Sequence, residues 1–113
     1  MIGQNMSVKK YFSFKKSEID RVFKNSKFKA RKPGLKLLQT PTELDYGKIL
    51  IVVPSSAGKA NERNKFKRRV RSIFYEEKLF ETKINSVLIV YKDAMQLSFE
   101  QIKKFLVGNI GPK

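Results

Sequence analysis

A dense run of basic side chains between residues 59 and 71 is the part of this sequence best suited to chemistry. On an ideal helix, with about 100° of rotation per residue, its polar residues form one stripe. The stripe consists of Arg63, Asn64, Lys67, Arg68 and Arg71. Arginine forks bridge phosphate oxygens, and the Asn64 amide can reach a base edge or a 2′-hydroxyl, or simply face solvent. Because these cations repel one another in an isolated helix, the pattern predicts neutralisation by the phosphates of a nucleic acid.

The same segment carries an apolar face beside the basic one, formed by Phe66, Val70, Ile73 and Phe74. A helix of this kind docks on a core while it keeps its polar edge open. The absence of Gly and Pro predicts a helix over 61–82, with Asn61 as its N-cap. Any basic amphipathic helix also fits a DNA major groove, so geometry alone does not choose between RNA and DNA.

The composition supports a polyanionic partner and excludes several enzyme classes. The 113 residues include 25 Lys and Arg against 10 Asp and Glu, a net charge of +15, and the excess lies in 1–40 and 55–75. With no Cys and no His, the chain has no thiolate nucleophile, no His general base and none of the commonest zinc ligands. The acidic residues are scattered or follow the basic stripe, which argues against a protein-only nuclease that holds Mg²⁺ itself.

The sequence contains no candidate for membrane insertion or export. Its longest apolar run, residues 49–53, is far shorter than the roughly 20 residues of a membrane-spanning helix. Residues 1–5 are too short and too polar for the apolar core of a signal peptide. We therefore expect a cytoplasmic protein with no membrane partner.

The remaining pattern predicts an α+β domain with the order α-β-β-β-α-β-α. Two helices are expected over 17–25 and 61–82, and a third is expected to begin at Ser98. The expected strands cover 28–31, 35–39, 48–53 and 86–91. Ser17 and Ser98 are the expected N-caps, with Gln101 completing a capping box, and Pro33-Gly34 marks a turn. The unbroken apolar run of 48–53 predicts a central strand covered on both faces. We expect one domain over 1–113, with flexible ends at 1–8 and 108–113.

Residues 63–71 also match a known signature. They read Arg-Asn-Lys-Phe-Lys-Arg-Arg-Val-Arg, which resembles the R-N-x-x-K-R-x-x-R motif of the bacterial ribonuclease P protein subunit. The resemblance extends over roughly residues 14–107 and includes Val22-Phe23, Gly58, Ala60 and Leu97. It implies a small α-β sandwich whose four-stranded sheet contains a left-handed βαβ crossover, although most such units are right-handed.

The resemblance implies a function as well as a fold. Members of this family bind a catalytic RNA and help it remove the 5′ leader of precursor tRNA by endonucleolytic hydrolysis. The RNA is the catalyst, so no catalytic residue is expected in the protein, and Mg²⁺ is expected to be held mainly by the RNA. The implied partners are that RNA and precursor tRNA, with a monomeric protein in the complex. The implied RNA-subunit contacts are Arg63, Asn64, Lys67, Arg68 and Arg71, together with Lys59 and Lys65.

The family also implies a cleft between the first helix and the sheet that holds the single-stranded leader. Ile19 and Phe23 match its helix positions, and Phe14 and Lys92 are expected to join them. Single-stranded RNA is held by aromatic stacking flanked by positive charge, which suits Phe14 and Phe23. Ile19 and Phe23 could instead simply pack the helix on the sheet.

Three departures from the family pattern bear on these expectations. Ser55-Ser56 stand where a Lys pair is usual, which implies weaker phosphate contact. Ile19 replaces a usual Phe, which removes one stacking platform, and Tyr91-Lys92 stand where an Arg commonly ends the last strand. Leader recognition is thus expected to differ more from the family than binding of the RNA subunit does.

Two other function classes compete with this interpretation. A ribosomal-type structural RNA-binding protein without a processing role would share the charge and the α-β build, but it gives no reason for the spacing of the signature. A DNA-binding module is the next alternative, because the basic helix suits a major groove.

Overall fold

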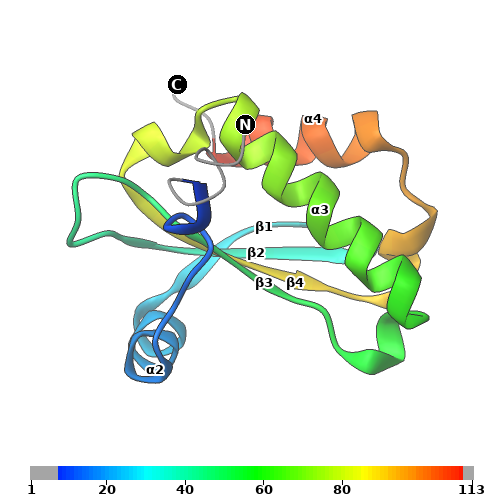
Figure 1. Cartoon of the computed structure of the whole chain (residues 1–113), viewed down its shortest axis with the longest axis horizontal. Coiled ribbons are helices and arrows are strands. Elements are labelled where there is room, and N and C mark those ends of the chain that lie inside the picture. The colour runs from blue at the N-terminus through cyan, green and yellow to red at the C-terminus, as the bar shows by residue number, and fades with distance from the viewer. Residues whose placement is uncertain (1–7, 111–113) are drawn as a thin grey trace.

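The computed structural model describes residues 8–110 and shows a four-stranded sheet with helices on both faces (Figure 1). Its helices are α2 (Lys16–Asn25), α3 (Ala60–Glu76) and α4 (Phe99–Ile110), and its strands are β1 (Lys27–Lys32), β2 (Leu35–Pro41), β3 (Ile49–Val52) and β4 (Ile84–Val90). Short 3₁₀ turns follow β3, α3 and β4, namely η1 (Ser55–Ala57), η2 (Leu79–Thr82) and η3 (Lys92–Gln96). The predicted α+β class and element order are confirmed.

The strand order is β1-β2-β4-β3, in which β3 pairs parallel with β4 and the other pairs are antiparallel. The expected parallel βαβ unit is therefore β3-α3-β4. The prediction that 48–53 is the central strand is wrong, because β3 lies at an edge and β4 is interior. Ile49 and Ile51 face the main core, whereas Leu50 and Val52 alternate to the opposite face. The strand is apolar on both faces without being central.

The main core lies between the sheet and the helices α3 and α4, which cover the same face (Figure 1). Leu37 of β2 and Leu88 of β4 point into it, and both are fully buried. The same core contains side chains from both helices: Phe66, Val70, Ile73 and Phe74 from α3, and Ile102, Phe105 and Leu106 from α4. This burial holds α3 in one orientation on the sheet. No helix in residues 8–110 is long and apolar enough to cross a membrane.

Each long helix begins with the same hydrogen bond, which corrects two predicted caps. In α2 the N-cap is Lys15, not Ser17, and in α3 it is Lys59, not Asn61. Glu18 and Glu62, three residues later, accept the N-cap backbone N–H at 3.1 and 2.9 Å. This is the returning half of a capping box. In α4 both halves form as predicted, since Ser98 and Gln101 exchange hydrogen bonds of 2.8 and 3.1 Å.

Helix α3 ends at Glu76, earlier than the predicted boundary at residue 82. In the frame of the stripe a continuous helix would place Leu79 at about 160°, next to the basic edge. Lys78 instead adopts a left-handed backbone conformation with φ 53°. The chain then turns through η2, and Leu79 is buried in the core. The need to bury this apolar side chain explains the early end of the helix.

The predicted turn at Pro33-Gly34 joins β1 to β2 and fastens the sheet to η3. Gly34 has φ 91°, and a Cβ at this position would lie 2.4 Å from the backbone nitrogen of Ala94. Its carbonyl accepts a 2.9 Å hydrogen bond from the N–H of Tyr91. Only glycine fits such a close backbone approach.

Of the ends expected to be flexible, 1–8 and 108–113, the structure describes residues 8 and 108–110. Residues 108–110 complete α4, and Ile110 is buried. At the other end, Tyr11 is buried in the aromatic part of the core, and its carbonyl accepts the N–H of Ile49 at 2.9 Å. Residues 1–7 and 111–113, which were also expected to be flexible, lie outside the described residues.

Helix α2 lies on the opposite face of the sheet from α3 and α4 (Figure 1). Val22 is buried there. The ammonium of Lys48, just before β3, lies 2.8 Å from Glu18 Oε2, and the Lys48 side chain is only 6% exposed. Burial alone raises the pKa of Glu18, but hydrogen bonds from Lys48 and from the Lys15 backbone outweigh it and lower the pKa. This ion pair fastens α2 to the edge of the sheet.

The lowered pKa of Glu18 predicts a pH-dependent contribution to stability. The folded state favours the carboxylate, so the pair stabilises fully above the usual Glu pKa and loses this effect as pH falls through the lowered value. We expect Glu18→Gln to cost about 1 kcal/mol in the free energy of unfolding at pH 7. The cost should disappear as pH falls below about 4, as measured by urea denaturation at several pH values. Asp20→Asn, an exposed change on the same helix, is the control and should cost little at any pH.

Candidate nucleic-acid interface

The basic stripe predicted on α3 is present on the surface of the structure. The apolar face of the helix is buried through Phe66, Val70, Ile73 and Phe74, and this burial leaves the neighbouring edge in solvent. Asn64, Arg68 and Arg71 are exposed, while Arg63 and Lys67, which border the apolar face, are half-buried. The structure therefore brings all five residues of the stripe together on one edge of a rigid helix.

One member of the stripe also supports the local backbone. The Nε–H of Arg63 donates a 3.1 Å hydrogen bond to the carbonyl of Gly58, in the connection between η1 and α3. Lys59, directly before the helix, is exposed. Lys65 is exposed too, but at about 200° in the helical frame it lies past Arg68, on a different edge. Lys59 thus extends the stripe along the helix axis, whereas Lys65 widens the basic surface.

The charge of the stripe is not neutralised within residues 8–110. The ion pairs in this part of the chain are Lys48 with Glu18 and Lys103 with Glu77, so no stripe cation contacts a carboxylate. Glu62, the nearest acid in sequence, accepts the Lys59 backbone N–H. Several uncompensated cations on one edge create a strong positive potential, which attracts a polyanion.

The residues predicted for the leader cleft are brought together only in part. With Val22 pointing into the sheet, Ile19 and Phe23 fall on one flank of α2, at about 60° and 100° from it. Ile19 is half-buried and Phe23 is 40% exposed. Phe14 lies at the start of α2, where the Lys48 ammonium is 4.3 Å from its ring centroid. Lys92 is exposed in η3, beyond the end of β4, so it does not lie beside α2.

Sequence reasoning missed the strand residues that form the floor of this region. Lys36 and Leu38 of β2 and Ile89 of β4 point to the face that carries α2, and all three are half-buried. Helix α2 lies at the other end of β4, where Val22 and Asn85 line one pocket, and the half-burial of these three side chains shows that this part of the sheet is incompletely covered. The alternation of β2, with Leu35 and Leu37 inward and Lys36 and Leu38 outward, is the signal that could have identified these residues.

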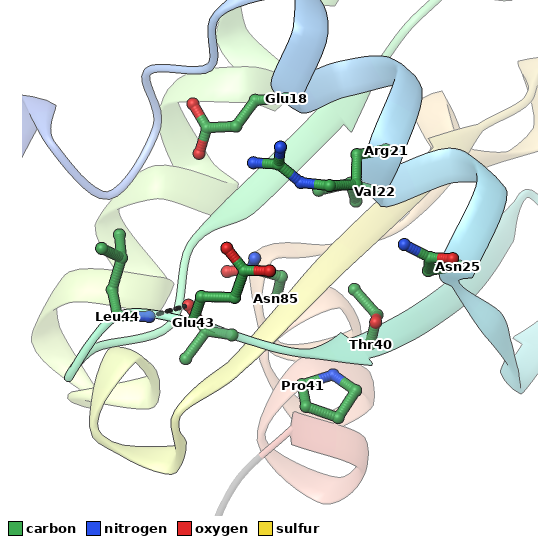
Figure 2. Close-up of a pocket in the computed structure, with 10 residues that line it drawn as sticks. Glu18, Arg21, Val22, Asn25, Thr40, Pro41, Glu43, Leu44 and Asn85 are labelled. Atoms are coloured by element: carbon green, nitrogen blue, oxygen red, sulfur yellow. Dashed lines mark hydrogen bonds between the residues drawn. The ribbon is translucent and has the colours of Figure 1, made fainter.

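The opposite flank of α2 borders a small polar pocket of about 110 Å³ (Figure 2). Glu18, Arg21 and Asn25 line it from the helix, and Glu43 and Asn85 line it from the loop after β2 and from β4. Two carboxylates beside a single guanidinium make it a poor site for a phosphate. Within residues 8–110, no three Asp or Glu side chains gather closely enough to hold a metal ion.

Together these features define a class of protein: a small basic α+β protein that presents a cationic helix edge to a polyanion. The chain matches the family model described as Ribonuclease P over residues 9–110, and it belongs to this family. It is 32% identical over 100 residues to the ribonuclease P protein component of Onion yellows phytoplasma (strain OY-M), which covers 88% of this chain and 71% of that protein. The chain is thus an RNA-binding protein component of ribonuclease P, a subunit of that endoribonuclease.

Solved structures agree with this assignment. The ribonuclease P protein from Thermotoga maritima is 26% identical and aligns with a TM-score of 0.76, covering 88% of this chain and 94% of that one. A Staphylococcus aureus RNase P protein mutant with defective mRNA degradation activity has a TM-score of 0.82 at 20% identity, with 97% and 93% coverage, and shows the shared fold. The family assignment carried by residues 63–71 is confirmed, and the ribosomal and DNA-binding alternatives are set aside.

The exposed stripe predicts a change in the salt dependence of RNA binding. Lys67→Ala combined with Arg68→Ala removes two cations, so fewer counterions are released on binding. We expect the slope of log K against log salt to fall by about one to two. The slope is measured by titrating a bacterial ribonuclease P RNA with protein at several salt concentrations. Lys27→Ala with Lys29→Ala, on exposed positions of β1, removes the same charge, and an equal loss in this control would show that location is irrelevant.

Proposed function

We propose that this protein binds the catalytic RNA of ribonuclease P through the basic stripe of α3 and helps the RNA remove the 5′ leader of precursor tRNA. The single observation that carries the proposal is the unpaired row of cations held on one edge of α3 by the buried face beside it. The RNA-subunit contacts proposed are Arg63, Asn64, Lys67, Arg68 and Arg71, extended by Lys59 and Lys65.

The second part of the proposal concerns the leader. Ile19 and Phe23 lie on the flank of α2 beside an incompletely covered part of the sheet. Lys36, Leu38 and Ile89 form that part of the sheet. An exposed phenyl ring beside apolar strand residues and a lysine suits the stacking and charge that hold single-stranded RNA. We assign the leader to this face, with Phe14 near its entrance at the start of α2. Lys92 is assigned to a more distant stretch of RNA beyond β4.

The chemistry of cleavage belongs to the RNA in this proposal. Phosphodiester hydrolysis is assisted by Mg²⁺, and the described residues provide no acidic cluster for that ion, so we assign the Mg²⁺ mainly to the RNA. The protein contributes by bringing positive charge between two polyanions, which lowers the repulsion between the catalytic RNA and precursor tRNA. We further propose that it works as a monomer within the complex, in the cytoplasm.

The decisive test is reconstitution with a bacterial ribonuclease P RNA. The protein alone should not cleave precursor tRNA, because the proposal assigns the catalytic groups to the RNA. Added to the RNA at low Mg²⁺, it should strongly increase the rate of leader removal, as measured by single-turnover cleavage of end-labelled precursor tRNA. The effect should shrink at high Mg²⁺, where the metal replaces the protein in screening the phosphates. Absence of stimulation at low Mg²⁺ would contradict the proposed function.

The leader assignment predicts a substrate-specific defect. Phe23→Ala removes a stacking surface worth about 1–3 kcal/mol per base, so the reconstituted enzyme should bind precursor tRNA more weakly, by roughly five- to tenfold or more. Its affinity for mature tRNA, which has no leader, should be unchanged. Leu44→Ala, an exposed apolar change in the loop at the other flank of α2, is the control. An equal loss of affinity for both tRNAs would place Phe23 outside the leader site.

A further inference from the structure

A groove lies between residues 8–13 and the C-terminal half of α3, beside the stripe and apart from the sheet face assigned to the leader. It measures about 620 Å³, within the range of roughly 300–1,000 Å³ typical of sites for small molecules. The residues that matter for its chemistry are Lys9, Phe12, Arg68, Arg71, Tyr75 and Glu76. We call it the N-terminal groove.

The aromatic side chains of the groove are held rigidly. Phe12 packs edge-on against the fully buried Phe74, with ring centroids 5.9 Å apart. Tyr75 stacks against Phe80 at 6.1 Å and is still 39% exposed. The guanidinium carbon of Arg71 lies 5.8 Å from the Phe12 ring centroid. Fixed aromatic rings next to a planar cation are a combination that accepts the face of a nucleobase.

The charges of the groove point to a nucleotide. Lys9, Arg68 and Arg71 supply positive charge for a phosphate, and Arg68 and Arg71 also belong to the stripe. Glu76 is the one carboxylate among the residues that line the groove, and it forms no ion pair within residues 8–110. An ionised carboxylate only accepts hydrogen bonds. The Glu76 carboxylate would repel a phosphate, but it can accept hydrogen bonds from the N–H groups on the edge of a base.

Guanine is the base whose donors fit a carboxylate best. Its N1–H and its amino group point in the same direction, so they can donate to both oxygens of Glu76. Adenine and cytosine offer one amino group, and uracil offers one N–H. Bases in unpaired RNA are read on this edge while their faces stack on aromatic side chains.

We propose that the N-terminal groove binds an unpaired guanine nucleotide of RNA, with its base against Phe12 and Tyr75, its Watson–Crick edge on Glu76 and its phosphate near Arg68 and Arg71. This proposal rests on the proposed function, because the stripe would bring the RNA to the groove. Binding in the groove would depend on the identity of the base, whereas binding to the cations of the stripe depends mainly on the charge of the RNA.

Short single-stranded RNAs test the base preference. The pentamers UUGUU, UUAUU, UUCUU and UUUUU, each with a fluorescent label, are titrated with the full-length protein and followed by anisotropy. We expect UUGUU to bind about five- to tenfold more tightly than the others. Glu76→Gln should reduce that preference to less than about twofold, whereas Glu100→Gln, an exposed acid on α4, should preserve it. A wild-type protein without the preference, or a Glu76→Gln variant that keeps it, would overturn the proposal.

The aromatic part of the site is tested without removing a packing residue. Phe12→Leu keeps an apolar side chain against Phe74 but removes the ring, and it should weaken UUGUU binding severalfold while the melting temperature changes little. Arg71→Lys keeps the charge and removes the planar fork, with a similar expected loss. Wild-type affinity for UUGUU in both variants would contradict stacking in the groove.

Crosslinking locates the guanine and identifies its source. A pentamer with a central 6-thioguanine is photo-crosslinked to the protein, and the expected adducts lie in residues 8–13 or 68–76. Adducts in α2 would overturn the proposal, as would free 5′-GMP binding as tightly as UUGUU, since the occupant would then not be RNA. If the groove fails these tests while the protein still stimulates the catalytic RNA, the proposed function stands and the groove alone is excluded. If the protein shows the guanine preference but does not stimulate the catalytic RNA, the proposed function is excluded and guanine binding by the groove stands.

Discussion

The packing of one face of α3 against the sheet is the interaction on which the rest of the structure depends. Phe66, Val70, Ile73 and Phe74 are removed from water, and burial of such side chains contributes roughly 1.5–3 kcal/mol each. That gain offsets the repulsion among cations on the adjacent edge of the same helix. Because the two faces share one rigid backbone, the core sets where every charge of the stripe lies. Binding of RNA then requires little reorganisation of the protein.

Patterns local to the chain predicted most of the fold and the basic edge of α3. The order of elements, the turn at Pro33-Gly34, the cap at Ser98 and the stripe from Arg63 to Arg71 all follow from spacing and side-chain type. The caps of α2 and α3 were predicted two residues too late, because Ser17 and Asn61 carry side chains of the kind that commonly cap helices. In both helices the decisive group is instead a glutamate three residues after the cap, which accepts the cap's own N–H. A Lys-x-x-Glu pattern ahead of an amphipathic segment would have located both starts.

Features that depend on distant parts of the chain were not accessible in this way. The position of β3 at the sheet edge depends on which strand pairs with β4, and an apolar run does not encode that choice. The half-buried side chains on the face of α2 come from both β2 and β4, and the N-terminal groove joins residues 8–13 to α3. The end of α3 was missed for a related reason, because Leu79 leaves the helix to reach a core that only the tertiary fold creates.

The two edge strands of the sheet, β1 and β3, differ in charge. The β1 margin carries Lys27, Lys29 and Lys32, whose charge discourages another chain from adding a strand. The β3 margin, Ile49–Val52, is uncharged, and the Tyr11 carbonyl covers only its first N–H. Here the short length of the strand and the net charge of the whole molecule are the features that oppose pairing with another copy. Anions that neutralise this charge without enclosing the protein would therefore promote its aggregation through β3, whereas a bound ribozyme would also keep copies physically apart.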